Sequence, residues 1–214
     1  MPQSARRYLL YLYVVLPALL LAGAAIYYLC PSLRLPANTD ALRRLPPVQA
    51  VDAHRYDQEW FDAARAGRLD ILGALHEAHY PIDSQTHAGF TAVILAAYDD
   101  QPAAVDYLLR AGADACIADH NGNTALMGSL YKGEPGIARR LLKAGCAIDQ
   151  TNNAGETALS FAALFGRLDI IPELVTLGAD PDHADARGRT ALQTAYAQGN
   201  PQAAEALRRA GASR

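Results

Sequence analysis

The stretch Gly155-Glu156-Thr157-Ala158-Leu159-Ser160-Phe161-Ala162-Ala163 decides the fold of this chain, because its pattern returns at a fixed interval. A glycine followed two residues later by Thr-Ala occurs four times, and each occurrence lies 33 residues from the next. These glycines are Gly89, Gly122, Gly155 and Gly188, and a second series with the same step is Gly112, Gly145, Gly178 and Gly211. A constant period of this length indicates stacked repeats that share one continuous core.

The 33-residue period, with G-x-T-A-L near its start and A-G-A near its end, resembles the ankyrin repeat. This resemblance implies an all-α fold, an ankyrin-repeat solenoid of about five helix-turn-helix repeats with β-turn fingers. We expect the domain to span 56–214, with repeats at about 56–84, 85–117, 118–150, 151–183 and 184–214. Because the first repeat lacks the Gly-x-Thr-Ala finger, we expect Trp60 and Phe61 to close the core at this end.

Residue types within each repeat indicate where its two helices begin. We expect the threonine of the pattern to cap the first helix, and a proline at a constant phase to begin the second helix. The threonines are Thr91, Thr124, Thr157 and Thr190, and the prolines are Pro102, Pro135 and Pro201. Pro172 lies about four residues into the expected second helix of the fourth repeat, where it should remove a backbone hydrogen bond and bend the helix.

The region before the repeats contains a long uncharged segment. Residues 8–29 carry no charge and, as a helix, would span the hydrocarbon core of a bilayer. Arg6 and Arg7 lie just before this segment, so the positive-inside rule predicts that residues 1–7 are cytoplasmic. We therefore expect 8–29 to be a transmembrane helix that acts as an uncleaved signal anchor and places the repeats in the periplasm.

A cleaved signal peptide is the alternative for this segment, because Ala22-Gly23-Ala24 matches the A-x-A cleavage pattern. Cleavage would leave a soluble periplasmic protein. The following residues, 30–55, contain four prolines and no helical period, so we expect an extended, semi-stiff linker.

Charge and cysteine content limit the classes of function. Residues 56–214 contain 13 Lys and Arg against 20 Asp and Glu, which argues against a nucleic-acid partner that needs a basic surface. Cys30, Cys116 and Cys146 are too few for a disulfide scaffold. We expect Cys116 and Cys146 to be buried free thiols, since most residues of neighbouring repeats lie farther apart than the roughly 7 Å that a disulfide tolerates.

Histidines are the only candidates for metal or cofactor chemistry in the sequence. His76 and His79 share one helix face without a third ligand nearby, and His87 and His120 are expected roughly 8–10 Å apart, too far to share one zinc ion. Motifs of common hydrolases and of nucleotide-binding enzymes are absent. We therefore expect no catalysis, no cofactor and no metal, and retain as the alternative a metal- or haem-binding carrier, or an enzyme, that uses these histidines.

The resemblance also implies where a partner binds, because ankyrin proteins usually bind partners on their concave face. Carried onto this sequence, that face contains the finger tips and the exposed end of each first helix. The expected partner-binding residues are Phe90, Tyr98, Tyr131, Leu164 and Phe165 in the centre, with His87, His120, Asn153 and Arg187 at the rim. In the competing interpretation Tyr98 and Tyr131 only cover the neighbouring helices.

Together these features predict a non-enzymatic protein–protein interaction scaffold that is anchored in the inner membrane and has its repeats in the periplasm. The chain resembles the small periplasmic ankyrin proteins of Gram-negative bacteria, some of which are associated with catalases and with resistance to peroxide. That resemblance implies that the protein supports a partner enzyme, such as a catalase, in defence against oxidative stress.

Overall fold

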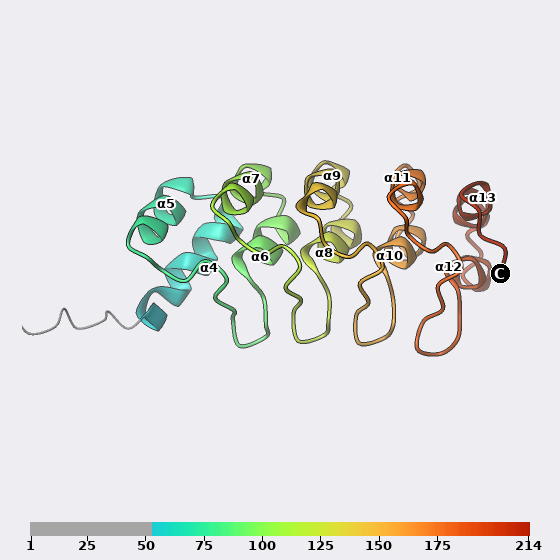
Figure 1. Cartoon of the computed structure of the whole chain (residues 1–214), viewed down its shortest axis with the longest axis horizontal. Coiled ribbons are helices and arrows are strands. Elements are labelled where there is room, and N and C mark those ends of the chain that lie inside the picture. Colours follow the sequence, from blue (N-terminus) through green and yellow to red (C-terminus); the bar gives the residue numbers. More distant parts are fainter. Residues whose placement is uncertain (1–52) are drawn as a thin grey trace, which may run out of the picture. The chain divides into compact units, whose positions relative to one another are not determined.

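Residues 53–214 are described by the structure, a computed structural model, and they form five consecutive pairs of helices (Figure 1). The first helices of the pairs form one row and the second helices form another (Figure 1). The first helices are α4 (Asp57–Ala66), α6 (Ala92–Tyr98), α8 (Ala125–Lys132), α10 (Ala158–Leu164) and α12 (Ala191–Ala197). The second helices are α5 (Leu69–Glu77), α7 (Pro102–Arg110), α9 (Pro135–Leu141), α11 (Ile171–Thr176) and α13 (Pro201–Arg209). The 3-10 helices η3 (Ala53–Tyr56) and η4 (Leu142–Ala144) precede α4 and follow α9.

The predicted N-terminal segments are not part of this description. The cytoplasmic segment 1–7, the transmembrane anchor 8–29 and the linker up to residue 52 lie outside the described residues. In the repeats themselves, from residue 53 onward, every helix is too short or too polar to cross a bilayer.

In the four complete repeats the first helix begins at its expected threonine. In α10 the Oγ1 atom of Thr157 accepts the N–H of Ser160, and the Oγ atom of Ser160 accepts the N–H of Thr157. This reciprocal capping satisfies two backbone donors that a helix start leaves without partners. The same threonine bond forms in the other three complete repeats, at Thr91, Thr124 and Thr190. The prediction that Pro102, Pro135 and Pro201 begin the second helices is also confirmed.

The predicted bend at Pro172 is wrong, because α11 begins at Ile171 and Pro172 lies in its first turn. A proline cannot donate to the carbonyl group four residues earlier, and its ring would clash with that group. The chain avoids both costs by forming a turn over 168–170 and starting the helix three residues later than its counterparts. As a result, α11 has 6 residues, whereas α7 and α13 have 9 each.

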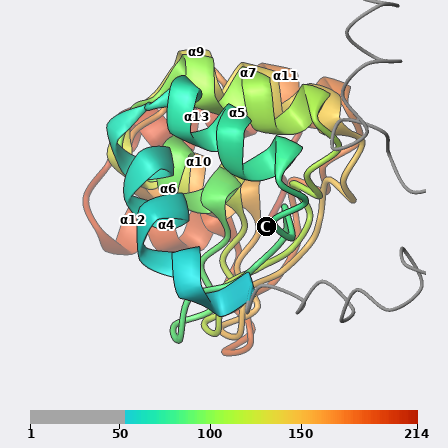
Figure 2. The ribbon, with the colours of Figure 1, turned by 90° about the vertical axis from the view of Figure 1, so that its left-hand side faces the viewer.

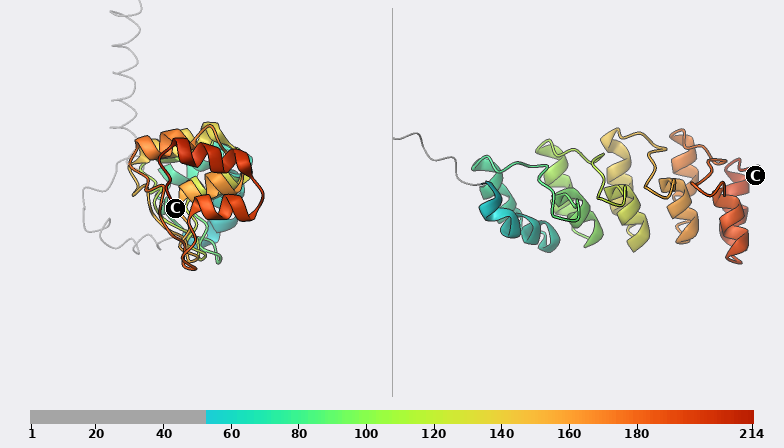
Figure 3. Two further views of the ribbon diagram at one scale, coloured as in Figure 1. Left: turned by 90° about the vertical axis from the view of Figure 1, so that its right-hand side faces the viewer. Right: turned by 90° about the horizontal axis from the view of Figure 1, so that it is seen from below.

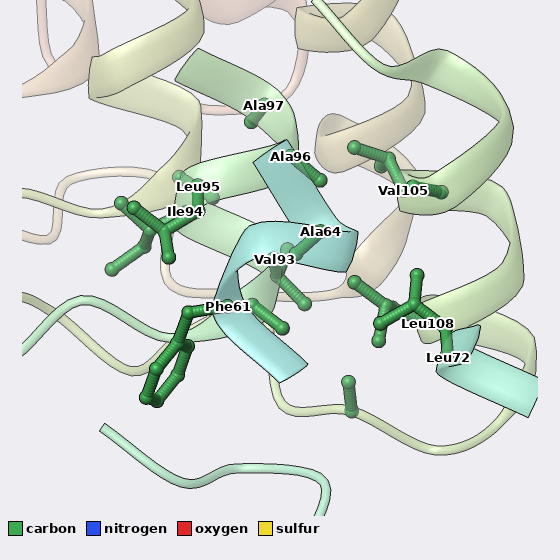
Figure 4. Close-up of a cluster of buried hydrophobic side chains, with 14 of the residues drawn as sticks. Phe61, Ala64, Leu72, Val93, Ile94, Leu95, Ala96, Ala97, Val105 and Leu108 are labelled. Atoms are coloured by element: carbon green, nitrogen blue, oxygen red, sulfur yellow. The ribbon is translucent and has the colours of Figure 1, made fainter. Parts of the chain in front are cut away.

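Apolar side chains from adjacent repeats pack into two core clusters, and Leu126 of the third repeat packs against both. Figure 4 shows part of one cluster, which contains residues such as Phe61 of α4, Leu72 of α5, Val93 of α6 and Leu108 of α7. Alanines fill much of the first-helix row, and small side chains allow neighbouring helices to approach closely. Every residue from Ala92 to Ala97 is buried.

The first repeat closes the core with aromatic side chains, as predicted. Trp60 is fully buried, Phe61 is 7% exposed, and the Trp60 ring lies 4.9 Å from the Tyr80 ring, centroid to centroid. The Tyr80 hydroxyl donates to Asp57. Burial, together with this hydrogen bond, raises the pKa of Tyr80 to about 12.

Between the helical pairs the chain forms β-turn fingers, which project side by side from the row of first helices (Figures 1 and 3). Viewed along the solenoid in Figure 2, they lie one behind another. Neighbouring fingers are joined by backbone hydrogen bonds, such as that from the N–H of Asn153 to the carbonyl of Asn121 at 2.9 Å. Residues 53–214 contain no β-strand, only isolated bridges at Gln85–Thr91 and Ala184–Thr190.

The expectation of two free thiols is wrong, because Cys116 and Cys146 form a disulfide that joins the second and third repeats. Their Cα atoms are 5.4 Å apart, and both side chains are partly exposed. The expectation was based on the distance between packed helices. These cysteines instead lie in loops outside the helices, where their Cα atoms come within the distance that a disulfide tolerates.

Candidate functional site

A groove of about 620 Å³ lies between the fingers and the first helices of the second, third and fourth repeats. One wall consists of finger residues, including Phe90, Asn123 and Glu156. The opposite wall consists of side chains from α6, α8 and α10, including Tyr98 and Tyr131. The groove is therefore formed by the elements that recur with the 33-residue period.

Four aromatic side chains in or directly after three successive first helices form a series of ring contacts in the groove, here called the aromatic stripe. The rings of Tyr98 and Tyr131 are stacked, with centroids 5.9 Å apart and an interplanar angle of 11°. Phe165 meets Tyr131 edge-on at 4.9 Å, and Phe161 lies 5.6 Å from Phe165. Tyr98 is 37% exposed and Tyr131 is 46% exposed, so both present a large apolar surface to water.

The stripe differs from the predicted central set, because it lacks Phe90 and Leu164 and contains Phe161. Leu164 has the same phase as Tyr98 and Tyr131, but it is partly buried and does not line the groove. The repeat period determines where the backbone of Leu164 lies, but its side chain is shorter than that of a tyrosine and does not reach the groove. Phe161 lines the groove and was not predicted, although its spacing of four residues from Phe165 on one helix face was a usable signal.

The predicted rim residues lie on the fingers and do not line the groove. His87, His120, Asn153 and Arg187 are all exposed. Two of them connect neighbouring fingers, since the His120 N–H donates to the Ala88 carbonyl and the Asn153 side-chain amide donates to the His120 carbonyl. Phe90 lines the groove and is partly buried.

A chain of hydrogen bonds, here called the polar wall, runs through Asp119, Asn123, Asn152 and Glu156 across two fingers. The Asn152 amide donates to the Oδ1 atom of Asn123 and to the Oε2 atom of Glu156, both at 3.0 Å. Asp119 accepts the N–H of Asn123 at 2.8 Å and is 8% exposed. Asp119 and Asn152 were not predicted as site residues. Their sequence signal is an Asp or Asn three residues before the finger glycine, and Asp185 has it too.

Basic side chains fix the ends of the first helices beside the groove. The Arg167 guanidinium donates to the Leu130 carbonyl at 2.9 Å and to the Tyr131 carbonyl at 3.0 Å, at the end of α8. These carbonyls are among those that a helix C-terminus leaves without partners. Arg65 forms an ion pair with Asp99 at 3.2 Å, just after α6. These contacts fix the backbone at the C-terminal ends of α6 and α8, which carry Tyr98 and Tyr131.

His76 and His183 have side-chain contacts within the fold. The His76 ring meets the Tyr107 ring edge-on at 6.4 Å, and His183 Nε2 lies 3.1 Å from the Gly155 carbonyl oxygen. Within the repeat domain described here, no three His, Cys, Asp or Glu side chains are grouped as a metal site requires.

Comparison with known proteins identifies the family. The family described as "Ankyrin repeats (3 copies)" matches residues 60–152 and 131–213, which together cover more than half of the chain. No curated protein matches the chain. Members of this family are typically non-enzymatic modules for protein–protein interaction. The chain's repeat period, its capped helical pairs and its hydrogen-bonded fingers agree with this match. The chain therefore belongs to the ankyrin-repeat family.

Proposed function

We propose that this protein is a non-enzymatic scaffold that binds a partner protein through the groove, with the aromatic stripe as the centre of the interface. The observation that carries the proposal is the stack of two exposed tyrosines, Tyr98 and Tyr131, at 5.9 Å in a groove of about 620 Å³. Tyrosine is enriched among residues that dominate binding energy, and contiguous exposed apolar surface is typical of interaction sites.

The test is the double variant Tyr98→Ala and Tyr131→Ala, assayed for capture of the partner protein from native cells and for thermal unfolding. Losing an aromatic side chain from an interface centre typically costs at least about 2 kcal/mol, so binding should weaken roughly thirtyfold. Folding should change less, because both rings are substantially exposed.

Tyr196→Ala is the matched control. Tyr196 is 50% exposed but does not line the groove, and its ring has Arg208 at 5.3 Å. The control should leave capture unchanged. If the double variant captures the partner as well as the unchanged protein does, the partner uses another face. If the double variant unfolds and its remaining folded fraction binds normally, the tyrosines are core residues.

The proposed location is the periplasm, with the repeats held at the inner membrane by residues 8–29. The disulfide between Cys116 and Cys146 supports this location, because disulfides persist in oxidising compartments and are rare in the cytosol. Alkaline phosphatase fused after Arg214 should be active. An inactive fusion would place the repeats in the cytoplasm, and a mature protein that begins at Ala25 would indicate cleavage.

The proposed partner class is an enzyme of peroxide defence such as a catalase, which rests on the resemblance to the small periplasmic ankyrin proteins. Material captured by the unchanged protein should contain catalase activity, and the Tyr98→Ala, Tyr131→Ala variant should retain little of it. Captured material that contains another protein and no catalase would remove this part of the proposal and leave the scaffold role intact.

A further inference from the structure

The groove contains a carboxylate that the described part of the chain does not neutralise. Glu156 lines the groove and is partly exposed, and residues 53–214 provide one hydrogen bond to it, from the Asn152 amide to Oε2. Asp119, the other carboxylate in the lining, is mostly buried and is used by the backbone of its own finger. Neither carboxylate forms an ion pair within these residues. Glu156 is therefore the accessible negative charge of the groove.

One basic side chain of the groove and one of the next finger already have carboxylate partners. Arg65, which lines the groove, forms an ion pair with Asp99 at 3.2 Å. Arg189 has the same phase as Glu156 in the next finger, but its guanidinium donates to the Asp185 carboxylate at 2.8 Å. Neither of these ion pairs includes Glu156, so its charge remains available to a ligand.

The aromatic stripe provides apolar faces that attract cations. Lys132 lies with its Nζ atom 4.6 Å from the centre of the Tyr98 ring, so the protein itself places one cation on the stripe. No basic side chain of residues 53–214 lies over Tyr131, Phe161 or Phe165 in this way. A cation within about 6 Å of an aromatic ring is attracted by its quadrupole. The fourth-repeat end of the stripe thus combines partly exposed aromatic rings that carry no cation of their own with the charge of Glu156.

We propose that the partner presents a peptide segment in which an arginine or lysine is flanked by apolar residues, and that this cation binds between Glu156 and the aromatic stripe. The proposal rests on the proposed function and specifies the chemistry of its ligand. Apolar neighbours of the cation would cover Tyr98 and Tyr131, while the cation would pair with the carboxylate and stack on the ring of Phe165. An acidic segment would be repelled by Glu156.

The experiment pans a displayed library of short linear peptides against the full-length chain in a mild non-ionic detergent. Selected peptides should share an arginine or lysine next to aromatic or branched apolar residues. The best binder is then synthesised in two forms, one with arginine and one with citrulline, which has nearly the same shape and no charge. Binding of both forms is measured to the unchanged protein, to Glu156→Gln and to the control Glu77→Gln, which alters an exposed carboxylate at the end of α5.

The expected result is a double-mutant cycle with strong coupling. Glu156→Gln and citrulline should each weaken binding about tenfold, and the two changes together should weaken it little further, because they remove the same contact. Glu77→Gln should have no effect. Rising ionic strength should weaken the arginine peptide more than the citrulline peptide, since salt screens exposed charge pairs.

Other outcomes overturn the inference and separate it from the proposed function. If the selected peptides lack a basic residue, or if citrulline binds as well as arginine, the cation has no role. The scaffold role then stands, provided that Tyr98→Ala with Tyr131→Ala abolishes binding. Peptides that bind this double variant normally contradict both proposals. A library without binders, or a chain that self-associates through Glu156, also rules out a linear basic ligand.

Discussion

Cys116 of the second repeat forms a disulfide with Cys146 of the third. Within the repeat period, Cys116 occupies the position at which other repeats have an aspartate. Each of those aspartates accepts a backbone N–H from the next repeat, 31 residues further along the chain. The pairs are Asp83 with Asp114, Asp149 with Asp180, and Asp182 with Ser213, at 2.9, 3.1 and 2.8 Å. The disulfide therefore joins two repeats at the point where the periodic hydrogen bond has lost its acceptor.

Reducing this disulfide should destabilise the repeat domain. Closing a loop of 30 residues restricts the unfolded chain, which corresponds to about 3–4 kcal/mol in the chain-entropy description. Urea unfolding with and without a thiol reductant measures the difference. An unfolding midpoint that does not respond to the reductant would show that the cysteines are not bridged in solution.

Two cysteine-free variants serve as controls for that experiment. The pair Cys116→Ala with Cys146→Ala should be less stable than the oxidised protein and insensitive to reductant. The pair Cys116→Asp with Cys146→Ala restores the periodic acceptor and should recover about 1 kcal/mol of that loss. No recovery would mean that the third-repeat loop cannot reach the new carboxylate.

The substitution Gly155→Ala should destabilise the protein more than Gly188→Ala does. Both glycines are left-handed, with φ of 76° and 77°, so alanine at either position costs about 1–2 kcal/mol. At Gly155 the added carbon would also lie 2.5 Å from the backbone nitrogen of Ala186, whereas at Gly188 nothing lies within 4 Å. Urea unfolding of the two variants should show an additional loss of about 1–3 kcal/mol for Gly155→Ala. Equal losses would indicate that the fingers separate freely.

Replacing Pro172 should lower stability slightly. The first turn of a helix accommodates proline, so its main effect is to restrict the unfolded chain. Pro172→Ala should therefore reduce the free energy of unfolding by about 0.4–1 kcal/mol, as should Pro135→Ala at the start of α9. A gain in stability for Pro172→Ala alone would mean that the proline opposes a longer helix in the fourth repeat.

The last repeat should loosen in acid. Hydrogen bonds from Ser213 hold the pKa of Asp182 below its ordinary value, and the backbone N–H of Arg189 does the same for the pKa of Asp185. Because both folded-state pKa values are lowered, the associated stability is complete above the unfolded value of about 3.9 and is lost as the pH falls through the folded values. Hydrogen exchange of the Ser213 amide should accelerate over this range beyond the ordinary pH dependence of an exposed amide. Asp182→Asn should flatten this additional dependence, and a variant with the unchanged profile would contradict it.

The sequence by itself determined the features that depend on residues close together in the chain. Thr157 caps α10 through Ser160, three residues away, Pro135 supplies the fixed backbone angle that begins α9, and Gly155 permits a left-handed turn. Because each interaction is complete within one repeat, reading one period was enough to predict all of its copies. The same period indicated that the repeats stack, and hence that the exposed side chains of the first helices form a line.

Only the tertiary structure decided which side chains meet between repeats. The contact pairs Cys116–Cys146, Asn123–Asn152 and Tyr131–Phe165 are each separated by about one repeat along the chain. Whether such a pair meets depends on the distance and angle between stacked repeats, and a shift of a few Å separates a disulfide from two free thiols. A sequence period contains neither quantity, so the disulfide and the hydrogen bond between Asn123 and Asn152 of the polar wall emerged only when the repeats were packed together.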